Sequence, residues 1–334
     1  FLLSVITATA QQGPTVNFEQ LNAMVTVIPQ EGRVEGEVEF LFEILRDTDS
    51  VFIDARNMDI QNVLLNDKKV EFHNDGNRLW VLSDFRSSRA NQLQFTYTAT
   101  PKQAIYFIGW NHASSSYKPQ VWTQGQGRYT SHWLPSFDDP AEKLVFDLKF
   151  LFPQNLEVIS NGKLVKKEPT SEGLIRWDFY MQHPMSSYLV AVAAGDYYKE
   201  EITSSGDVPI SLYFYPGDEN KLEPTYRYTK KIFDFFEKEI GVPFPWQNYK
   251  QIPVRDFLYS GMENVGATIF SDIFVVDSVG FVDRNYVMVN AHEMAHQWFG
   301  DLVTAASGEH HWLQEGFATY YSLLAEREIF GEDY

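Results

Sequence analysis

Two histidines and a glutamate stand at the spacing H-E-x-x-H in the run HEMAH at residues 292–296. On an α-helix, residues i and i+4 lie on the same face, so the imidazoles of His292 and His296 project together. Two neutral imidazoles on one face can bind a single Zn²⁺ ion. Glu293 lies about 100° further round the helix, where its carboxylate can reach a water molecule on the metal. The spacing therefore predicts a metal site with a general base beside it.

A catalytic zinc usually has three protein ligands and one open position. Glu315 can supply the third ligand, because it follows His296 after 18 intervening residues in the run WLQEGFA at 312–318. We therefore predict one zinc ion per chain, held by His292, His296 and Glu315. The alternative is a buried helix with two hydrogen-bonded core histidines, and the downstream glutamate disfavours it.

The composition limits the class of protein. A length of 334 residues suggests about two domains, and 44% hydrophobic residues can build substantial cores. The net charge of −18 disfavours nucleic acid, which is bound through lysine and arginine contacts to phosphates. The chain has no cysteine, which excludes disulfides and thiolate chemistry. It also has no run of about 18 apolar residues, so we predict no membrane span.

The first ten residues, Phe1–Ala10, allow two interpretations. An apolar stretch followed by Ala-Thr-Ala is typical of the end of a secretory signal peptide, which would place the protein in the periplasm or outside the cell. The same residues are rich in β-branched side chains and are also compatible with an N-terminal strand, and then a cytoplasmic location is expected.

From residue 16 to about 197 the chain alternates short apolar runs with polar turns, which predicts a β-sandwich or saddle-like sheet. Beyond residue 205 the pattern changes to mixed helix and strand. One helix is expected over 221–240, a metal-binding helix over 283–299 with Asp283 as its N-cap, and a further helix over 312–328. The predicted class is α+β, with an N-terminal domain at 1–204 and a second domain at 205–334.

Three motifs resemble those of the aminopeptidase N family of zinc metallopeptidases. They are SGMEN at 260–264, AHEMAHQWFG at 291–300 and WLQEGFA at 312–318. LPSFDDP at 134–140 and GVPFPW at 241–246 add weaker support. The resemblance implies a saddle-like all-β domain followed by the start of a thermolysin-like α/β zinc catalytic domain. It also implies a helical C-terminal domain supplied by the rest of a longer chain, and a catalytic tyrosine beyond Tyr334.

The resemblance also implies roles for individual residues. Glu293 would be the general base that activates the zinc-bound water. Glu263 would bind the free α-amine of a peptide substrate, with Gln126 beside it. The remaining substrate-binding positions implied by the motif are Gly261, Met262 and Asn264.

Four positions allow a plainer interpretation. Glu263 taken alone could cap a turn, but its place about 30 residues before the zinc motif favours substrate binding. His310 and His311 are expected to be exposed loop residues and not ligands. Asp301 stands where the family usually has asparagine, and we expect little effect from that difference.

The predicted function is a zinc-dependent aminopeptidase that removes the N-terminal residue from peptides. A thermolysin-like endopeptidase is disfavoured, because Glu263 would select substrates with a free amine. The alternative from another class is a catalytically weak zinc-binding fragment or module that binds peptides or forms part of a larger assembly.

Overall fold

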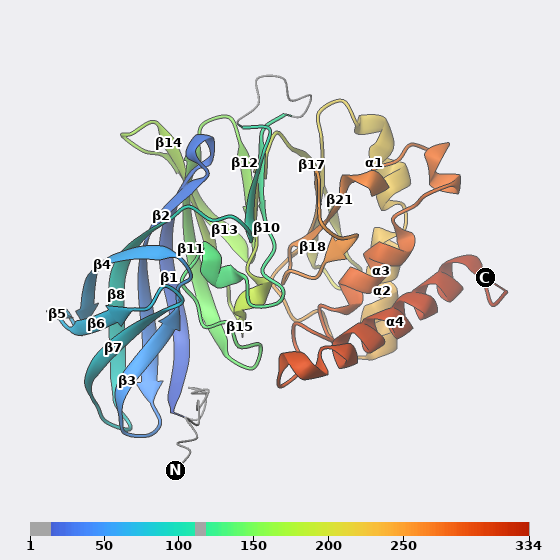
Figure 1. The fold of residues 1–334 in the computed structure, drawn as a ribbon. Coiled ribbons are helices and arrows are strands. Elements are labelled where there is room, and N and C mark those ends of the chain that lie inside the picture. The colour runs from blue at the N-terminus through green and yellow to red at the C-terminus, as the bar shows by residue number, and fades with distance from the viewer. Residues whose placement is uncertain (1–14, 111–117, 334) are drawn as a thin grey trace, which may run out of the picture.

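The computed structural model describes residues 15–110 and 118–333, so the question of signal peptide or strand at Phe1–Ala10 lies outside the described residues. In this part of the chain the strands form four sheets, and four α-helices gather in the second half. Figure 1 shows the β-rich first half in blue and green and the helical second half in yellow and red.

The largest sheet runs through the first half. Its long strands alternate buried and more exposed residues, as in β2 (Arg33–Ile44), where Val38, Phe40 and Phe42 are buried and the residues between them, Glu39 and Leu41, are partly exposed. Period-two alternation of this kind buries one face of a sheet. In spatial order the strands are β13 (Lys163–Pro169), β14 (Leu174–Tyr180), β11 (Lys143–Pro153), β1 (Val16–Ile28), β2 (Arg33–Ile44), β8 (Ala90–Ala99), β4 (Met58–Leu65) and β5 (Lys68–Lys69), with β15 (Met185–Ser186) paired to β11.

A three-stranded sheet covers part of the buried face of the largest sheet. Phe137 lies between the two sheets, with ring centroids 5.3 Å from Phe18 on β1 and 5.4 Å from Phe52 on β3. The first half is therefore a β-sandwich in this region. The strands of the small sheet, in spatial order, are β3 (Thr48–Asp54), β7 (Arg78–Phe85) and β6 (Glu71–Asn74).

A four-stranded sheet joins the two halves. Trp122 on β10 belongs to a buried cluster that also contains Ile252 and Ile269 of the second half, and its indole N–H donates to the carbonyl of Arg255. This shared core fixes the loop after β10 against the second half. In spatial order the strands are β12 (Glu157–Ser160), β16 (Val192–Gly195), β10 (Gln120–Thr123) and β9 (Ile105–Ile108).

The second half is built on a five-stranded sheet with the α-helices packed around it. Its short edge strand β20 pairs antiparallel with β21 and lies against α3 (Val287–Ala295), which brings residues 261–264 next to the helix that carries His292. In spatial order the strands are β17 (Tyr198–Thr203), β18 (Pro209–Phe214), β19 (Tyr249–Val254), β21 (Thr268–Ser271) and β20 (Gly261–Met262).

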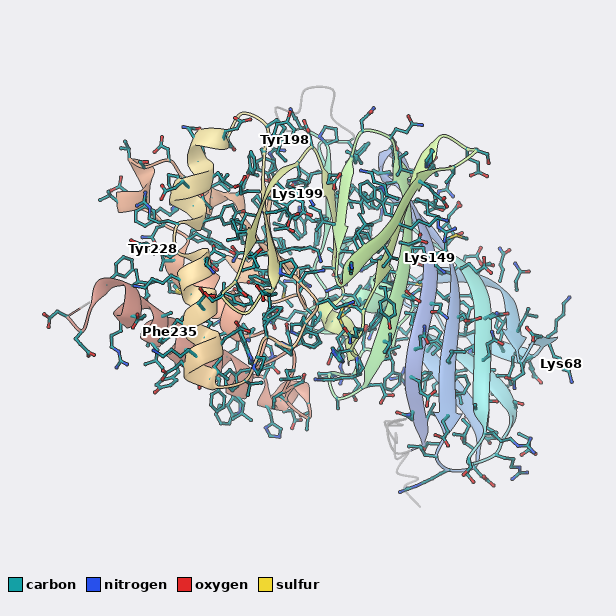
Figure 2. The ribbon with its side chains drawn as sticks, turned by 180° about the vertical axis from the view of Figure 1, so that it is seen from behind. Lys68, Lys149, Tyr198, Lys199, Tyr228 and Phe235 are labelled. Atoms are coloured by element: carbon teal, nitrogen blue, oxygen red, sulfur yellow. The ribbon has the colours of Figure 1, made fainter. Side chains whose placement is uncertain are left out.

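The helices depart from prediction at their ends. The helix expected over 221–240 is two helices, α1 (Glu219–Tyr226) and α2 (Thr229–Ile240), because Tyr228, with φ −106° and ψ 0°, leaves the helical region. Figure 2 shows Tyr228 and Phe235 along α2, seen from behind. The last helix, α4 (Trp312–Phe330), extends slightly beyond its expected end.

Helix α3 (Val287–Ala295), which carries His292, is shorter than expected, and Asp283 is not its N-cap. Asp283 instead closes a 3₁₀ turn, where its N–H donates to the carbonyl of Gly280. Asn285 satisfies an N–H at the helix start, because its side-chain oxygen accepts from Val287. Beyond α3, the backbone N–H groups as far as Phe299 still donate to carbonyls three or four residues earlier.

The α+β class is confirmed, with a β domain preceding a partly helical region. A domain boundary at 204/205 stays a prediction; the pairing of β17 with β18 attaches residues 198–203 to the second sheet. Among residues 15–110 and 118–333, no helix is both long enough and apolar enough to span a bilayer.

Candidate metal centre

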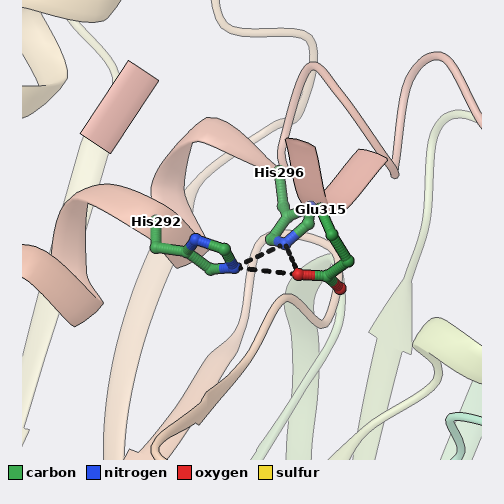
Figure 3. Close-up of side chains that lie close together, drawn as sticks. All are labelled: His292, His296 and Glu315. Atoms are coloured by element: carbon green, nitrogen blue, oxygen red, sulfur yellow. Dashed lines mark hydrogen bonds and ion pairs between the residues drawn. The ribbon is translucent and has the colours of Figure 1, made fainter. Parts of the chain in front are cut away.

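The three predicted ligands meet where α3 faces the start of α4 (Figure 3). The Nε2 atoms of His292 and His296 are 3.1 Å apart. The Oε2 atom of Glu315 lies 3.2 Å from Nε2 of His292 and 3.7 Å from Nε2 of His296. Two imidazole nitrogens and one carboxylate oxygen are the donor set of many catalytic zinc sites. The residues present therefore fit a zinc ion.

Local contacts orient the buried histidine. The Nδ1 atom of His296 lies 2.9 Å from the carbonyl oxygen of Phe299. Since a carbonyl only accepts, Nδ1 carries a proton, and the lone pair of neutral His296 is on Nε2, which faces the other two ligands. The turn after α3 thus places the histidine and selects its tautomer.

The charges around His296 favour a cation. Burial on its own would lower the pKa of His296, but the nearby carboxylates of Glu263, Glu315 and Glu293 raise it to about 10. Three carboxylates around one buried imidazole stabilise positive charge, whether a proton or a metal ion carries it.

Glu293 is buried beside the ligands, with 6% of its surface exposed. Burial raises the pKa of its carboxyl group to about 8, with the charges of Glu263 and Glu315 adding to the effect and His296 opposing it. One carboxylate oxygen of Glu293, one of Glu263 and a ring nitrogen of His296 all lie within 4.8 Å of one another. Glu293 is thus close enough to a bound metal to exchange a proton with a water molecule there.

Glu263 follows the edge strand β20 and is 2% exposed. Its backbone carbonyl accepts a hydrogen bond from the side chain of Gln297, which holds the strand end against the turn after α3. Its Oε1 atom has no hydrogen-bond partner among the described residues. A buried carboxylate oxygen in this state is costly unless a ligand donates to it.

A cavity of about 390 Å³ brings these residues together. Gly261, Glu263 and Gln126 line it along with the ligands, whereas Met262 and Asn264 are almost completely buried behind it. Gln126 comes from the loop after β10, so the shared core of the two halves places it at the site. Substrate-binding roles for these five residues stay predictions. The full lining is Gln126, Tyr259, Ser260, Gly261, Glu263, Met288, Val289, His292, Glu293, His296, Glu315, Thr319 and Ser322.

The sequence interpretation missed His311. This residue was expected in an exposed loop, but it is only partly exposed, and its Nε2 atom lies 3.0 Å from Oε1 of Glu315. The hydrogen bond to Glu315 raises the pKa of His311. A signal was present, because His311 and Glu315 are spaced i, i+4 at the start of a helix and therefore share a face. His310 is exposed, as expected.

Comparison with known families finds one match in each half of the chain. Residues 18–189 match the peptidase M1 N-terminal domain, and residues 225–333 match the peptidase family M1 domain. The chain belongs to peptidase family M1. The zinc-binding motif and Glu315 both lie within the matched M1 domain, and Gln126 lies within the matched M1 N-terminal domain.

Curated M1 relatives are similar over most of this chain. A leucyl aminopeptidase of Saccharolobus solfataricus is 31% identical over 294 residues, which are 86% of this chain and 36% of the relative. Leucine aminopeptidase 2 of Yarrowia lipolytica is 29% identical over 307 residues, 90% of this chain and 45% of the relative. Glutamyl aminopeptidase of Sus scrofa is 30% identical over 203 residues, 58% of this chain and 22% of the relative. The chain thus spans less than half the length of these relatives.

Proposed function

We propose that this M1 chain carries the metal centre of a zinc aminopeptidase, which removes the N-terminal residue from peptides. The observation that carries the proposal is the buried Glu263 carboxylate within 4.8 Å of both Glu293 and His296. A zinc endopeptidase also needs a metal and a base, but recognition of a free amine calls for a further anion at this distance.

Zinc would be held by His292, His296 and Glu315, and when bound it would polarise the scissile carbonyl and increase the acidity of water. Glu263 binds the α-ammonium group of the substrate through a charge-assisted hydrogen bond to its buried carboxylate. That contact sets the cleavage point at the first peptide bond, because internal residues carry no such charge.

Glu293 moves the proton. Its carboxylate accepts a proton from the attacking water and later donates it to the nitrogen of the leaving amine. Burial raises the pKa of the Glu293 carboxyl group, which makes its carboxylate a stronger proton acceptor for the attacking water. Help of this kind is typically worth about 10²- to 10⁴-fold in rate.

The test compares a free-amine aminoacyl amide with its N-acetylated counterpart. The zinc-loaded protein is expected to cleave the free-amine substrate and to leave the acetylated one largely intact. In Glu263→Gln, which keeps the size but removes the charge, KM for the free-amine substrate should rise. Equal cleavage of both substrates by the wild-type protein would contradict the aminopeptidase assignment and favour an endopeptidase.

A further inference from the structure

The two oxygens of the Glu315 carboxylate face different partners. Oε2 points to the two ligand histidines, 3.2 Å and 3.7 Å from their Nε2 atoms. Oε1 points the other way and lies 3.0 Å from Nε2 of His311. A carboxylate can only accept, so His311 carries its proton on Nε2 and donates it to Glu315.

His311 is held in place from two sides. It directly precedes α4, and its backbone carbonyl accepts a hydrogen bond from the N–H of Glu315. On the other side, the side-chain amide nitrogen of Gln126 lies 3.0 Å from the same Nε2 atom. Because the single proton on Nε2 is directed at Glu315, Gln126 packs against His311 and does not share that hydrogen bond. The hydrogen-bonded pair is therefore His311 and Glu315, with the loop after β10 packed beside it.

This arrangement has a consequence for metal binding. A carboxylate on a half-exposed helix turn can rotate, and each rotation presents a different oxygen to the metal. A hydrogen bond to one oxygen fixes the rotation and leaves the other oxygen directed at the cation. Partners of this kind typically contribute about 10- to 100-fold to metal affinity or activity.

We propose that His311 is a positioning residue, which fixes the carboxylate of Glu315 for metal binding. The inference rests on the proposed function only through the assignment of Glu315 as a zinc ligand. His311 does not bind the metal through Nε2, because that atom carries the proton donated to Glu315.

The experiment measures the zinc affinity of the 334-residue chain by competition with a chromophoric chelator, without any peptide substrate. His311→Leu should bind zinc about 10- to 100-fold more weakly than the wild-type protein. His311→Gln can still donate from a similar position, so it should restore affinity to within about threefold. His310→Leu is the matched control, because it removes an exposed histidine one residue away, and its affinity should equal that of the wild type.

Cobalt absorption provides a second reading. Co²⁺ in place of zinc should show a changed visible spectrum in His311→Leu and a wild-type spectrum in His311→Gln, because the spectrum follows the ligand geometry. The inference is overturned if His311→Leu keeps wild-type affinity and spectrum, or if His311→Gln loses as much as His311→Leu. Because substrate is absent from both measurements, a failure of the aminopeptidase assignment would leave these results unaffected.

Discussion

A single methyl group on Gly261 should displace the carboxylate of Glu293, the proposed general base. Gly261 lies on β20 against α3, and a Cβ atom built on it would lie 2.4 Å from Oε1 of Glu293 and 2.6 Å from both Cγ and Cδ. Ordinary contacts of a Cβ atom begin at 3.4 Å, so the carboxylate must retreat by about 1 Å. Gly261 does not have a positive φ, so alanine brings no backbone strain, and the three atoms nearest to the new methyl group all belong to Glu293.

A misplacement of about 1 Å in a catalytic group can cost about 100-fold in rate. We therefore expect kcat of Gly261→Ala to fall about 100-fold, which lies at the lower end of the loss expected when general-base catalysis is removed. Zinc content should not change, because none of the three ligands contacts the new methyl group among its nearest atoms.

The assay combines metal analysis with turnover of a saturating aminoacyl amide. Gly316→Ala is the matched control, since it follows the ligand Glu315 directly and a Cβ atom there meets no described atom within 4 Å. That variant should keep wild-type turnover and gain about 0.5–1 kcal/mol in unfolding free energy, because alanine is preferred to glycine inside a helix. Wild-type kcat in a folded, zinc-loaded Gly261→Ala protein would refute the placement of Glu293 as the base.

Three further substitutions test the site. His296→Ala should lose stoichiometric zinc, and one zinc per chain in that variant, by elemental analysis, would show that the ligand set is wrong. Glu293→Gln should keep zinc and lose about 10²- to 10⁴-fold in turnover, because an amide cannot accept the proton of water; near-normal turnover would exclude the general-base role. Asp301→Asn should raise the unfolding free energy of the zinc-free protein by about 1–3 kcal/mol at pH 7, because neither carboxylate oxygen of this buried residue has a hydrogen-bond partner among the described residues. Burial raises the pKa of Asp301 in the folded protein well above its ordinary value of 3.8. Below pH 3.8 the carboxyl group is therefore protonated in both states and costs the folded protein nothing, and the folded state loses stability as the pH rises from 3.8 through the raised pKa. Chemical denaturation should therefore show the two proteins converging toward pH 4, and a difference that does not depend on pH would contradict this explanation.

The environment of Asp301 could not be predicted from the sequence. Aspartate in place of the family's usual asparagine was expected to have little effect, and that expectation stays a prediction. The turn after α3 buries it completely, next to Lys143, whose ammonium group donates to the backbone carbonyl of Asp301 and not to its side chain. Burial and hydrogen-bond satisfaction are properties of the tertiary structure, so spacing along the chain cannot reveal them.

Periodic features were predictable because they depend only on local geometry. The strands of the first half alternate with period two, and their existence was predicted well, whereas helix ends were not. Asp283 has the right residue type for an N-cap, but its backbone N–H closes a 3₁₀ turn before the helix begins. The side chain of Asn285 accepts from the N–H of Val287 at the helix start instead. Such competition between nearby turns depends on packing around them.

The sequence by itself determined which side chains share one helix face in the proposed metal centre. The i, i+4 spacing of His292 and His296 puts both rings on one face of any helix that forms there, whatever surrounds it. Only the tertiary structure decided which residues from distant segments complete the site. Gln126 lies 185 residues before His311 in the chain, and the two meet only because a core around Trp122 packs the four-stranded sheet against the five-stranded one. Contacts between distant segments follow from how whole elements pack, and no local pattern encodes that packing.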